Sequence, residues 1–247
     1  MDIRHYLDST YLKTAQQAGI PEAENLGIVK KTVQEAIDLR LKLVMIRPDY
    51  VALAKQMVDH QKSTLLIGTV IDFPNGTSSV SDKVSEARKA IEDGADELDF
   101  VLNYLAFKNG NVALVKDEVL EGSAIGLHSH KVVKWIIETA ALNDLQIAQL
   151  SALVKNVVFT NFKEDQYQSV FVKSSTGFFV TEEGIPNGAT PESVVIMLEN
   201  ACPLPVKAAG GVRTYEEAEQ MIQLGVKRIG TSAAKAITEG RIADTEY

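Results

Sequence analysis

Short apolar runs alternate with longer amphipathic runs along the chain. The short runs are rich in Val, Ile and Leu, a pattern typical of strands that are buried on both faces. They predict eight strands, at residues 6–9, 42–46, 65–71, 97–101, 132–137, 169–173, 205–208 and 228–230. Between these runs, apolar residues recur at helical spacing, as at Leu26, Val29, Val33 and Ala36.

Several of the predicted helices carry end signals. Asn143 and Thr214 are each followed three residues later by Gln or Glu, which is the spacing of a capping box. Thr190 precedes Pro191, an N-cap residue followed by proline at the first helical position. Gly225 follows a predicted helix and suits a left-handed C-terminal cap.

Eight strands that alternate with helices in 247 residues favour a TIM-type (β/α)8 barrel. We therefore expect one α/β barrel domain over residues 1–247, with a short C-terminal tail. A doubly wound open sheet is the structural alternative. It is disfavoured because no G-x-G-x-x-G motif follows the first strand and because polar residues end many strands rather than gathering at one switch point.

Composition and charge narrow the function classes. The net charge is −8 and the sequence has no basic stripe, so a nucleic-acid partner is not expected. The longest nearly apolar stretch, residues 65–71, is far shorter than the roughly 20 residues of a membrane span. The N-terminus lacks a secretory pattern, and the single cysteine, Cys202, excludes an intrachain disulfide. We expect a cytoplasmic protein.

Two lysines close neighbouring predicted strands. Lys173 ends the sixth strand and Lys207 lies at the end of the seventh, while Asp99 lies in the fourth. In a barrel, chemistry collects at the carboxyl ends of the strands. Each ammonium group would lower the pKa of the other, because like charges disfavour the charged form. A neutral amine is what a Schiff-base nucleophile requires, and a nearby carboxylate can move its protons.

A purely structural role for these charged residues is also possible. A single lysine at a strand end is more often a snorkelling side chain or an ion-pair partner. Asp99 would then be a plain counter-ion, a role that is compatible with proton transfer. Two lysines on adjacent strands favour the chemical interpretation. The first strand adds Asp8 and Thr10 as candidate substrate-binding residues.

Glycines follow the last strands. Gly210 and Gly211 come after the seventh strand, and Gly230 and Ser232 lie at the end of the eighth. In many TIM barrels these two loops bind phosphate through backbone N–H groups, which glycine lets approach closely. A lone Gly-Gly is more often a turn, but the pair of signals favours an anion site, which Gly177 after the sixth strand would extend.

Other polar residues give weaker indications of a functional site. His128 and His130 precede the fifth strand, at the end of the barrel opposite the chemistry, so a metal site is not expected there. Lys134 lies in the middle of the fifth strand, and we expect it to point into the barrel and pair with a carboxylate, with strand four as the candidate source.

Six segments resemble class I deoxyribose-phosphate aldolases in family order, across residues 7 to about 232. They begin at Leu7, Gly68, Gly94, Lys134, Val172 and Lys207, and the most specific are K-x-S-T-G and K-x-x-G-G-V-R-T, here V-K-S-S-T-G and K-A-A-G-G-V-R-T. The resemblance implies a barrel enzyme that reversibly cleaves 2-deoxy-D-ribose 5-phosphate to acetaldehyde and D-glyceraldehyde 3-phosphate. It implies no metal and no organic cofactor.

The resemblance also implies residue roles. Lys173 would form the Schiff base, and Asp99 and Lys207 would donate and accept protons. Gly177, Gly210, Gly211 and Ser232 would hold the phosphate. Some members of the family end in a tyrosine that assists proton transfer at the enamine carbon, and Tyr247 resembles it; a frayed tail is the alternative.

Three hypotheses remain open. The first is the Schiff-base aldolase. The second is a phosphate-binding barrel isomerase or epimerase that uses carboxylates alone and does not need both lysines. The third is a non-catalytic barrel that senses a sugar phosphate. All three take small phosphorylated ligands, and a homodimer is the candidate assembly.

Overall fold

Eight parallel strands close into a barrel in this computed structural model, which describes residues 2–240. Each strand pairs with the next along the chain, and β8 pairs with β1. The strands are β1 (Leu7–Tyr11), β2 (Leu43–Ile46), β3 (Leu66–Ile71), β4 (Glu97–Val101), β5 (Val132–Ile136), β6 (Val170–Lys173), β7 (Val206–Ala209) and β8 (Arg228–Thr231). The fold-class prediction is confirmed.

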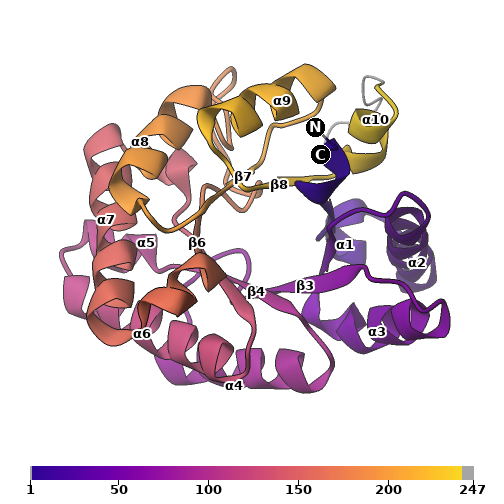
Figure 1. Cartoon of the computed structure of the whole chain (residues 1–247), viewed down its shortest axis with the longest axis horizontal. Coiled ribbons are helices and arrows are strands. Elements are labelled where there is room, and N and C mark those ends of the chain that lie inside the picture. The colour runs from indigo at the N-terminus through magenta and orange to yellow at the C-terminus, as the bar shows by residue number, and fades with distance from the viewer. Residues whose placement is uncertain (1, 241–247) are drawn as a thin grey trace.

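Helices surround the strands on the outside of the barrel (Figure 1). They are α1 (Ala15–Ala18), α2 (Glu22–Asp38), α3 (Val51–His60), α4 (Val80–Glu92), α5 (Tyr104–Lys108), α6 (Val112–His128), α7 (Asp144–Asn161), α8 (Pro191–Ala201), α9 (Tyr215–Leu224) and α10 (Ala234–Thr238). Short 3-10 turns lie at Ile3–His5, Pro48–Tyr50, Thr139–Ala141 and Glu164–Ser169. None of the helices in residues 2–240 is long and apolar enough to cross a membrane.

The predicted elements agree closely with those observed. Every predicted strand overlaps an observed one, with ends that differ by at most two residues. The capping boxes at Asn143 and Thr214 form, Thr190 caps α8 with Pro191 at its start, and Gly225 ends α9 in the left-handed conformation. That residues 1–247 make one domain with a C-terminal tail stays a prediction, and the tail lies outside the described residues.

The main hydrophobic core fills the layer between strands and helices. It includes fully buried side chains such as Val44, Ile67, Trp135 and Ile229. A second, smaller apolar cluster is formed by Leu12 and by side chains of β2 and β3, namely Leu43, Met45 and Val70; Leu66, Phe73 and Phe178 pack against it. Charged side chains from β4 through β8 and from β1 are buried as well, which is unusual unless the charges are paired.

The register of the barrel sets which charges become neighbours. Asp99 of β4 is the partner of Lys134 on β5, and Lys173 of β6 is the partner of Lys207 on β7. Side chains on paired residues of adjacent strands point to the same face. The expectation that Lys134 points into the barrel and meets a carboxylate of strand four is therefore confirmed.

Candidate active site

The carboxylate of Asp99 joins three lysines. Its Oδ2 accepts hydrogen bonds from Lys173 Nζ at 2.8 Å and from Lys207 Nζ at 2.9 Å. Its Oδ1 accepts one from Lys134 Nζ at 2.6 Å. Asp99, Lys134 and Lys207 are fully buried and Lys173 is 3% exposed, so water screens these contacts little.

This group continues into a second set of buried charges. Lys207 Nζ lies 2.6 Å from Asp8 Oδ2, and Lys134 Nζ lies 2.6 Å from Glu97 Oε2. Arg228, at the start of β8, donates through Nη1 to Glu97 at 2.8 Å and through Nε and Nη2 to Asp8. The charged side chains of β1, β4, β5, β7 and β8 thus form a closed circuit, and Lys173 of β6 joins it through Asp99.

The charges in this circuit do not balance if every group is ionised. The circuit holds three carboxylates, from Asp8, Glu97 and Asp99, and four basic groups, from Lys134, Lys173, Lys207 and Arg228. An uncompensated buried charge is costly. The interior becomes neutral when one lysine gives up its proton.

Lys173 is the lysine that gives up its proton most readily. Burial, together with the charges of Lys207 and Lys134, lowers its pKa from 10.5 to about 8, although Asp99 opposes the shift. The sequence argument named the neighbouring ammonium as the cause. Burial is the larger cause, because the charged amine loses its hydration inside the barrel.

Asp99 and Lys134 stay ionised. Burial acts to raise the pKa of Asp99, but the charges of Lys134, Lys173 and Lys207 outweigh it and hold that pKa well below 3.8. Burial acts to lower the pKa of Lys134, but Asp99 and Glu97 raise it above 10.5. The site therefore combines a carboxylate that is ionised at rest with an amine whose pKa is about 8.

A cavity of about 80 Å³ opens beside Lys173 at the carboxyl ends of the strands. Its walls come from the segments that follow β1, β6, β7 and β8, and they are mostly backbone and small side chains. The lining residues are Thr10, Leu12, Lys173, Thr176, Gly177, Asn187, Ala209, Gly210, Gly211, Val212, Arg213, Gly230, Thr231 and Ser232.

The cavity brings together most of the residues predicted for the site. Seven of them line it: Lys173, Thr10, Gly177, Gly210, Gly211, Gly230 and Ser232. Asp8, Asp99 and Lys207 do not line it; they lie in the buried circuit and contact one another through Lys207. Tyr247 lies outside the described residues.

Backbone packing shapes the anion side of the cavity. Gly210 has φ +80°, and a Cβ there would meet Gly188 Cα at 2.8 Å. A Cβ on Gly188 would lie 2.3 Å from the Gly210 carbonyl, so neither position has room for a side chain. Ala189 N–H donates to the carbonyls of Ala209 and Gly210. The long segment before α8 is therefore fastened to the end of β7.

Sequence reasoning missed several residues of this site. Arg228 and Glu97 were recognised as strand residues only, yet a charge inside an apolar strand is the same signal that identified the lysines. Asn187, whose side chain donates to the Gly177 carbonyl at 3.3 Å, lies in an irregular segment that gave no signal. Arg213 lies at the rim of the cavity.

The two histidines that were not expected to bind a metal lie away from the cavity. His128 ends α6, and His130 follows it on the way into β5, at the opposite end of the barrel. Within residues 2–240, no cluster of three His, Cys, Asp or Glu side chains could hold a metal ion. The absence of a metal or cofactor stays a prediction.

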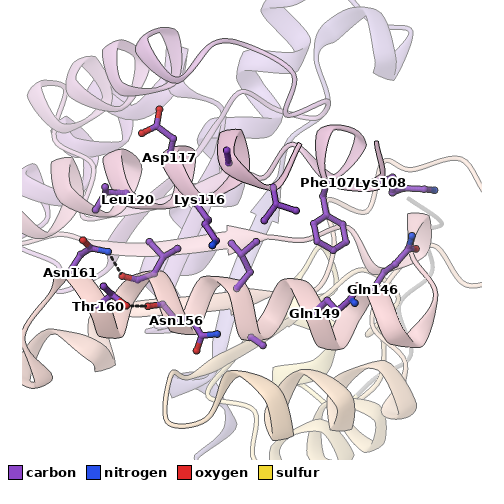
Figure 2. A pocket seen from close by; sticks show the side chains of 15 residues that line it. Phe107, Lys108, Lys116, Asp117, Leu120, Gln146, Gln149, Asn156, Thr160 and Asn161 are labelled. Carbon is purple, nitrogen blue, oxygen red and sulfur yellow. Dashed lines mark hydrogen bonds between the residues drawn. The ribbon is translucent and has the colours of Figure 1, made fainter. Parts of the chain in front are cut away.

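A larger groove of about 980 Å³ lies on the outside of the barrel between α6 and α7 (Figure 2). It contains none of the predicted site residues. Polar groups on its α7 side bond to that helix's own backbone, Thr160 to the Asn156 carbonyl and Asn161 to the Val157 carbonyl, both at 2.8 Å (Figure 2). The chemistry-bearing side chains gather inside the barrel instead.

Comparisons with known proteins point the same way. Residues 12–241 match the model of the DeoC/LacD family aldolases. A deoxyribose-phosphate aldolase of Thermococcus gammatolerans is 39% identical over 241 residues, covering 97% of this chain and 96% of the relative. One from Staphylococcus saprophyticus is 36% identical over the full length of both chains.

Solved structures show the same fold. An aldolase designated QR15 superposes with a TM-score of 0.77 at 32% identity, covering 97% of this chain and 95% of that one. A deoxyribose phosphate aldolase of Aeropyrum pernix, described as a unique tetramer, superposes with a TM-score of 0.75 at 26% identity, covering 96% of this chain and 89% of that one.

Proposed function

This chain belongs to the DeoC/LacD aldolase family, and we propose that it is a Schiff-base deoxyribose-phosphate aldolase. It reversibly cleaves 2-deoxy-D-ribose 5-phosphate to acetaldehyde and D-glyceraldehyde 3-phosphate. The observation that carries the proposal is the contact of Lys173 and Lys207 with one oxygen of Asp99, in a site where the Lys173 pKa falls to about 8.

Lys173 is the nucleophile. Its neutral amine attacks C1 of the open-chain sugar to give a carbinolamine, and loss of water from the carbinolamine gives an iminium ion. Burial keeps a useful fraction of this amine neutral at physiological pH. Lys173 is also the ionisable residue of the circuit that lines the cavity, so its Nζ is the amine that a ligand there meets.

The iminium ion then accepts the electrons of the breaking C2–C3 bond. A base removes the C3 hydroxyl proton, the C3 fragment leaves as glyceraldehyde 3-phosphate, and an enamine remains on Lys173. Protonation of the enamine at C2 and hydrolysis of the resulting iminium ion release acetaldehyde. Asp99 accepts hydrogen bonds from the amines of both Lys173 and Lys207. We therefore assign to Asp99 and Lys207 the transfer of protons to and from Lys173 and its adducts.

The glycine-rich wall of the cavity binds the phosphate. Gly177, Gly210 and Gly211 all have positive φ and carry no side chain, so an anion can approach their backbone N–H groups closely. Gly230 and Ser232 line the cavity from β8 and the segment after it, and Thr10 lines it from the neighbouring strand β1. Asp8 does not line the cavity, and its role is to hold the Lys207 side chain in place through their ion pair.

The two other hypotheses predict a different outcome at Lys173. An isomerase or epimerase that uses carboxylates alone has no need of an amine with a lowered pKa. A sugar-phosphate sensor gains nothing from that amine and bears the cost of a buried, partly unpaired cation. The arrangement of Lys173, Lys207 and Asp99 favours the aldolase.

Borohydride trapping tests the proposal. The protein is incubated with acetaldehyde and borohydride, and the adduct is located by peptide mass spectrometry. We expect an ethyl group on Lys173 and none in Lys173→Arg, which keeps a positive charge but forms no imine at neutral pH. An adduct of unchanged yield in Lys173→Arg would reject Lys173 as the nucleophile, and retro-aldol activity without any adduct would reject the mechanism.

Assembly and compartment are proposals as well. A homodimer is the assembly we propose, and the cytoplasm is the compartment. None of the proposed steps requires a metal or an organic cofactor.

A further inference from the structure

A buried carboxyl group just after β5 is bonded to the loop that carries the catalytic lysine. The side chain of Glu138 is 1% exposed. Its Oε2 accepts hydrogen bonds from the backbone N–H of Thr176, at 3.2 Å, and from the Thr176 hydroxyl. Thr176 lines the cavity, whereas Glu138 does not. Its hydrogen bonds therefore connect Glu138 to the cavity through Thr176.

Glu138 completes a series of contacts between the β5 and β6 loops. Ile137 N–H donates to the Lys173 carbonyl at 3.0 Å, and Thr139 N–H donates to the Ser174 carbonyl at 2.9 Å. The hydroxyls of Thr139 and Ser175 lie 2.9 Å apart. Each residue from Lys173 to Thr176 is thus fixed to residues 137–139.

The Thr176 hydroxyl also restricts the position of Gly177. It accepts a hydrogen bond from Phe178 N–H at 3.0 Å, while it donates to Glu138. Gly177, which has φ +79°, lies between the two residues that this hydroxyl joins. A shift of Thr176 would therefore move the Gly177 N–H relative to Lys173.

The position of Glu138 costs stability. Its backbone is left-handed, with φ +58°, a conformation that is unfavourable for a residue other than glycine. Its second oxygen, Oε1, is buried and makes no hydrogen bond within residues 2–240. Burial raises its pKa against the opposing effect of the Thr176 hydrogen bonds. Costs of this kind, next to a reactive group, indicate a role other than stabilisation.

We propose that Glu138 is a positioning residue, which holds Thr176 so that the Gly177 backbone stands at a fixed distance from Lys173 for the phosphate end of the substrate. This inference rests on the proposed function, because it assigns the Gly177 side of the cavity to phosphate. Glu138 does not line the cavity, and although the charge of Lys173 acts on its pKa, its hydrogen bonds go to Thr176. Its loss should therefore act mainly on the fit of the phosphorylated substrate, and the Lys173 adduct reports any effect on the amine.

The test compares KM for 2-deoxyribose 5-phosphate with KM for 2-deoxyribose. Glu138→Ala removes both hydrogen bonds to Thr176, and hydrogen bonds to a charged group typically carry enough free energy for about a tenfold effect. We expect KM for the phosphorylated substrate to rise about tenfold while KM for 2-deoxyribose and the borohydride adduct on Lys173 stay near wild type. Glu138→Gln, which keeps one acceptor oxygen, is expected to restore most of the affinity.

Two further variants keep the test decisive if Glu138→Ala does not fold. Thr176→Val removes only the hydroxyl and is expected to give an intermediate rise in KM for the phosphorylated substrate. Glu118→Gln is the matched control. Glu118 is another buried carboxyl, which accepts from Asn103 N–H at 3.0 Å and from Lys83 at 2.7 Å, and neither partner lines the cavity. It is expected to lower the melting temperature without changing the ratio of the two KM values.

The outcomes separate this inference from the proposed function. Equal changes in both KM values across the Glu138 and Thr176 variants, or no change, would overturn the positioning role while the wild-type aldolase stands. A wild-type protein without retro-aldol activity would overturn the proposed function. In that case the affinity for inorganic phosphate, measured by calorimetry, tests the inference alone: it falls in Glu138→Ala if the role is correct, and an unchanged value rejects it.

Discussion

Lys173 and Lys207 are direct partners in the register of β6 and β7, and their Nζ atoms donate to the same oxygen of one carboxylate. Two ammonium groups so close together disfavour each other's charge. The shared acceptor, Asp99 Oδ2, holds both in place. Removing either neighbour of Lys173 should therefore move its pKa, and the two removals should move it in opposite directions.

Lys207→Leu should raise the pKa of Lys173. The charge of Lys207 lowers that pKa, and its removal also leaves Asp99 free to stabilise the protonated amine. We expect the rising limb of the pH profile of kcat/KM to move from near pH 8 to higher pH, by about one pH unit. A uniform loss of rate at every pH would instead identify Lys207 as a direct proton carrier. Wild-type kinetics at all pH values would remove Lys207 from the mechanism.

Asp99→Asn should shift the same pKa downward. The negative charge of Asp99 raises the pKa of Lys173, so its loss leaves the amine neutral at lower pH. Borohydride trapping with acetaldehyde should then proceed at lower pH than in the wild type. At the same time kcat should fall by about 10²- to 10⁴-fold, because a proton carrier is lost. A kcat close to wild type would show that Asp99 only neutralises charge.

Lys173→Met should stabilise the fold. The pKa of Lys173 falls from 10.5 in the unfolded chain to about 8, so the folded state binds this proton less well. The resulting cost, about 3 kcal/mol at pH 7, is present in full below pH 8 and disappears as the pH rises to 10.5. We expect the free energy of unfolding in urea to increase by about 2–3 kcal/mol at pH 7, with a difference that vanishes above pH 10.5.

Lys134→Met is the matched comparison and should have the opposite sign. Its pKa is raised, so its contribution to stability is fully present below pH 10.5 and is lost only as the pH rises through the higher folded value. Removing it leaves Glu97 and Asp99 short of one cation, and breaking a buried pair costs about 3–5 kcal/mol. Equal destabilisation by both substitutions would contradict the lowered pKa of Lys173.

Gly211→Val should weaken binding of the phosphorylated substrate. Gly211 has φ +85° and lines the cavity, and a Cβ placed on it would have no non-neighbouring atom closer than 4.0 Å. There is room for this Cβ in the protein, and the valine would extend into the space proposed for the anion. We expect KM for 2-deoxyribose 5-phosphate to rise about tenfold or more, a loss of about 1.4 kcal/mol, with little change for 2-deoxyribose.

Gly19→Val controls for backbone strain in that experiment. Gly19 has φ +67°, caps α1 and also has open space where a side chain would lie, but it does not line the cavity. It should lower the melting temperature to a similar extent and leave both KM values unchanged. Equal losses on both substrates in Gly211→Val would indicate general distortion.

Tyr247→Phe tests the role implied for the C-terminal tyrosine, which lies outside the described residues. If its phenol delivers a proton to the enamine carbon, kcat should fall while the Lys173 adduct and KM stay nearly intact. Exchange of deuterium into the acetaldehyde methyl group should slow in parallel. Exchange at the wild-type rate in the variant would remove Tyr247 from catalysis.

The amino-acid sequence alone was enough to predict the barrel and the end of it at which the site lies. Strand and helix positions follow from local periodicity, and the caps at Asn143, Thr190 and Thr214 follow from hydrogen bonds that span three residues. The placement of Lys173 beside Lys207 follows from two consecutive parallel strands that each carry one lysine. These features depend on neighbours in sequence or on adjacent strands, so a single sequence is enough to predict them.

Which charged side chains contact one another, and how their pKa values change, depends on the closed barrel. Asp99 lies 74 residues from Lys173 and 108 from Lys207, and their contact depends on closure of the barrel and on its register. The inward direction of Arg228 and the reach of Glu138 to Thr176 depend on the same closure. Burial, the main cause of the lowered Lys173 pKa, belongs to the whole fold, because it takes eight strands and their helices to exclude water from one amine.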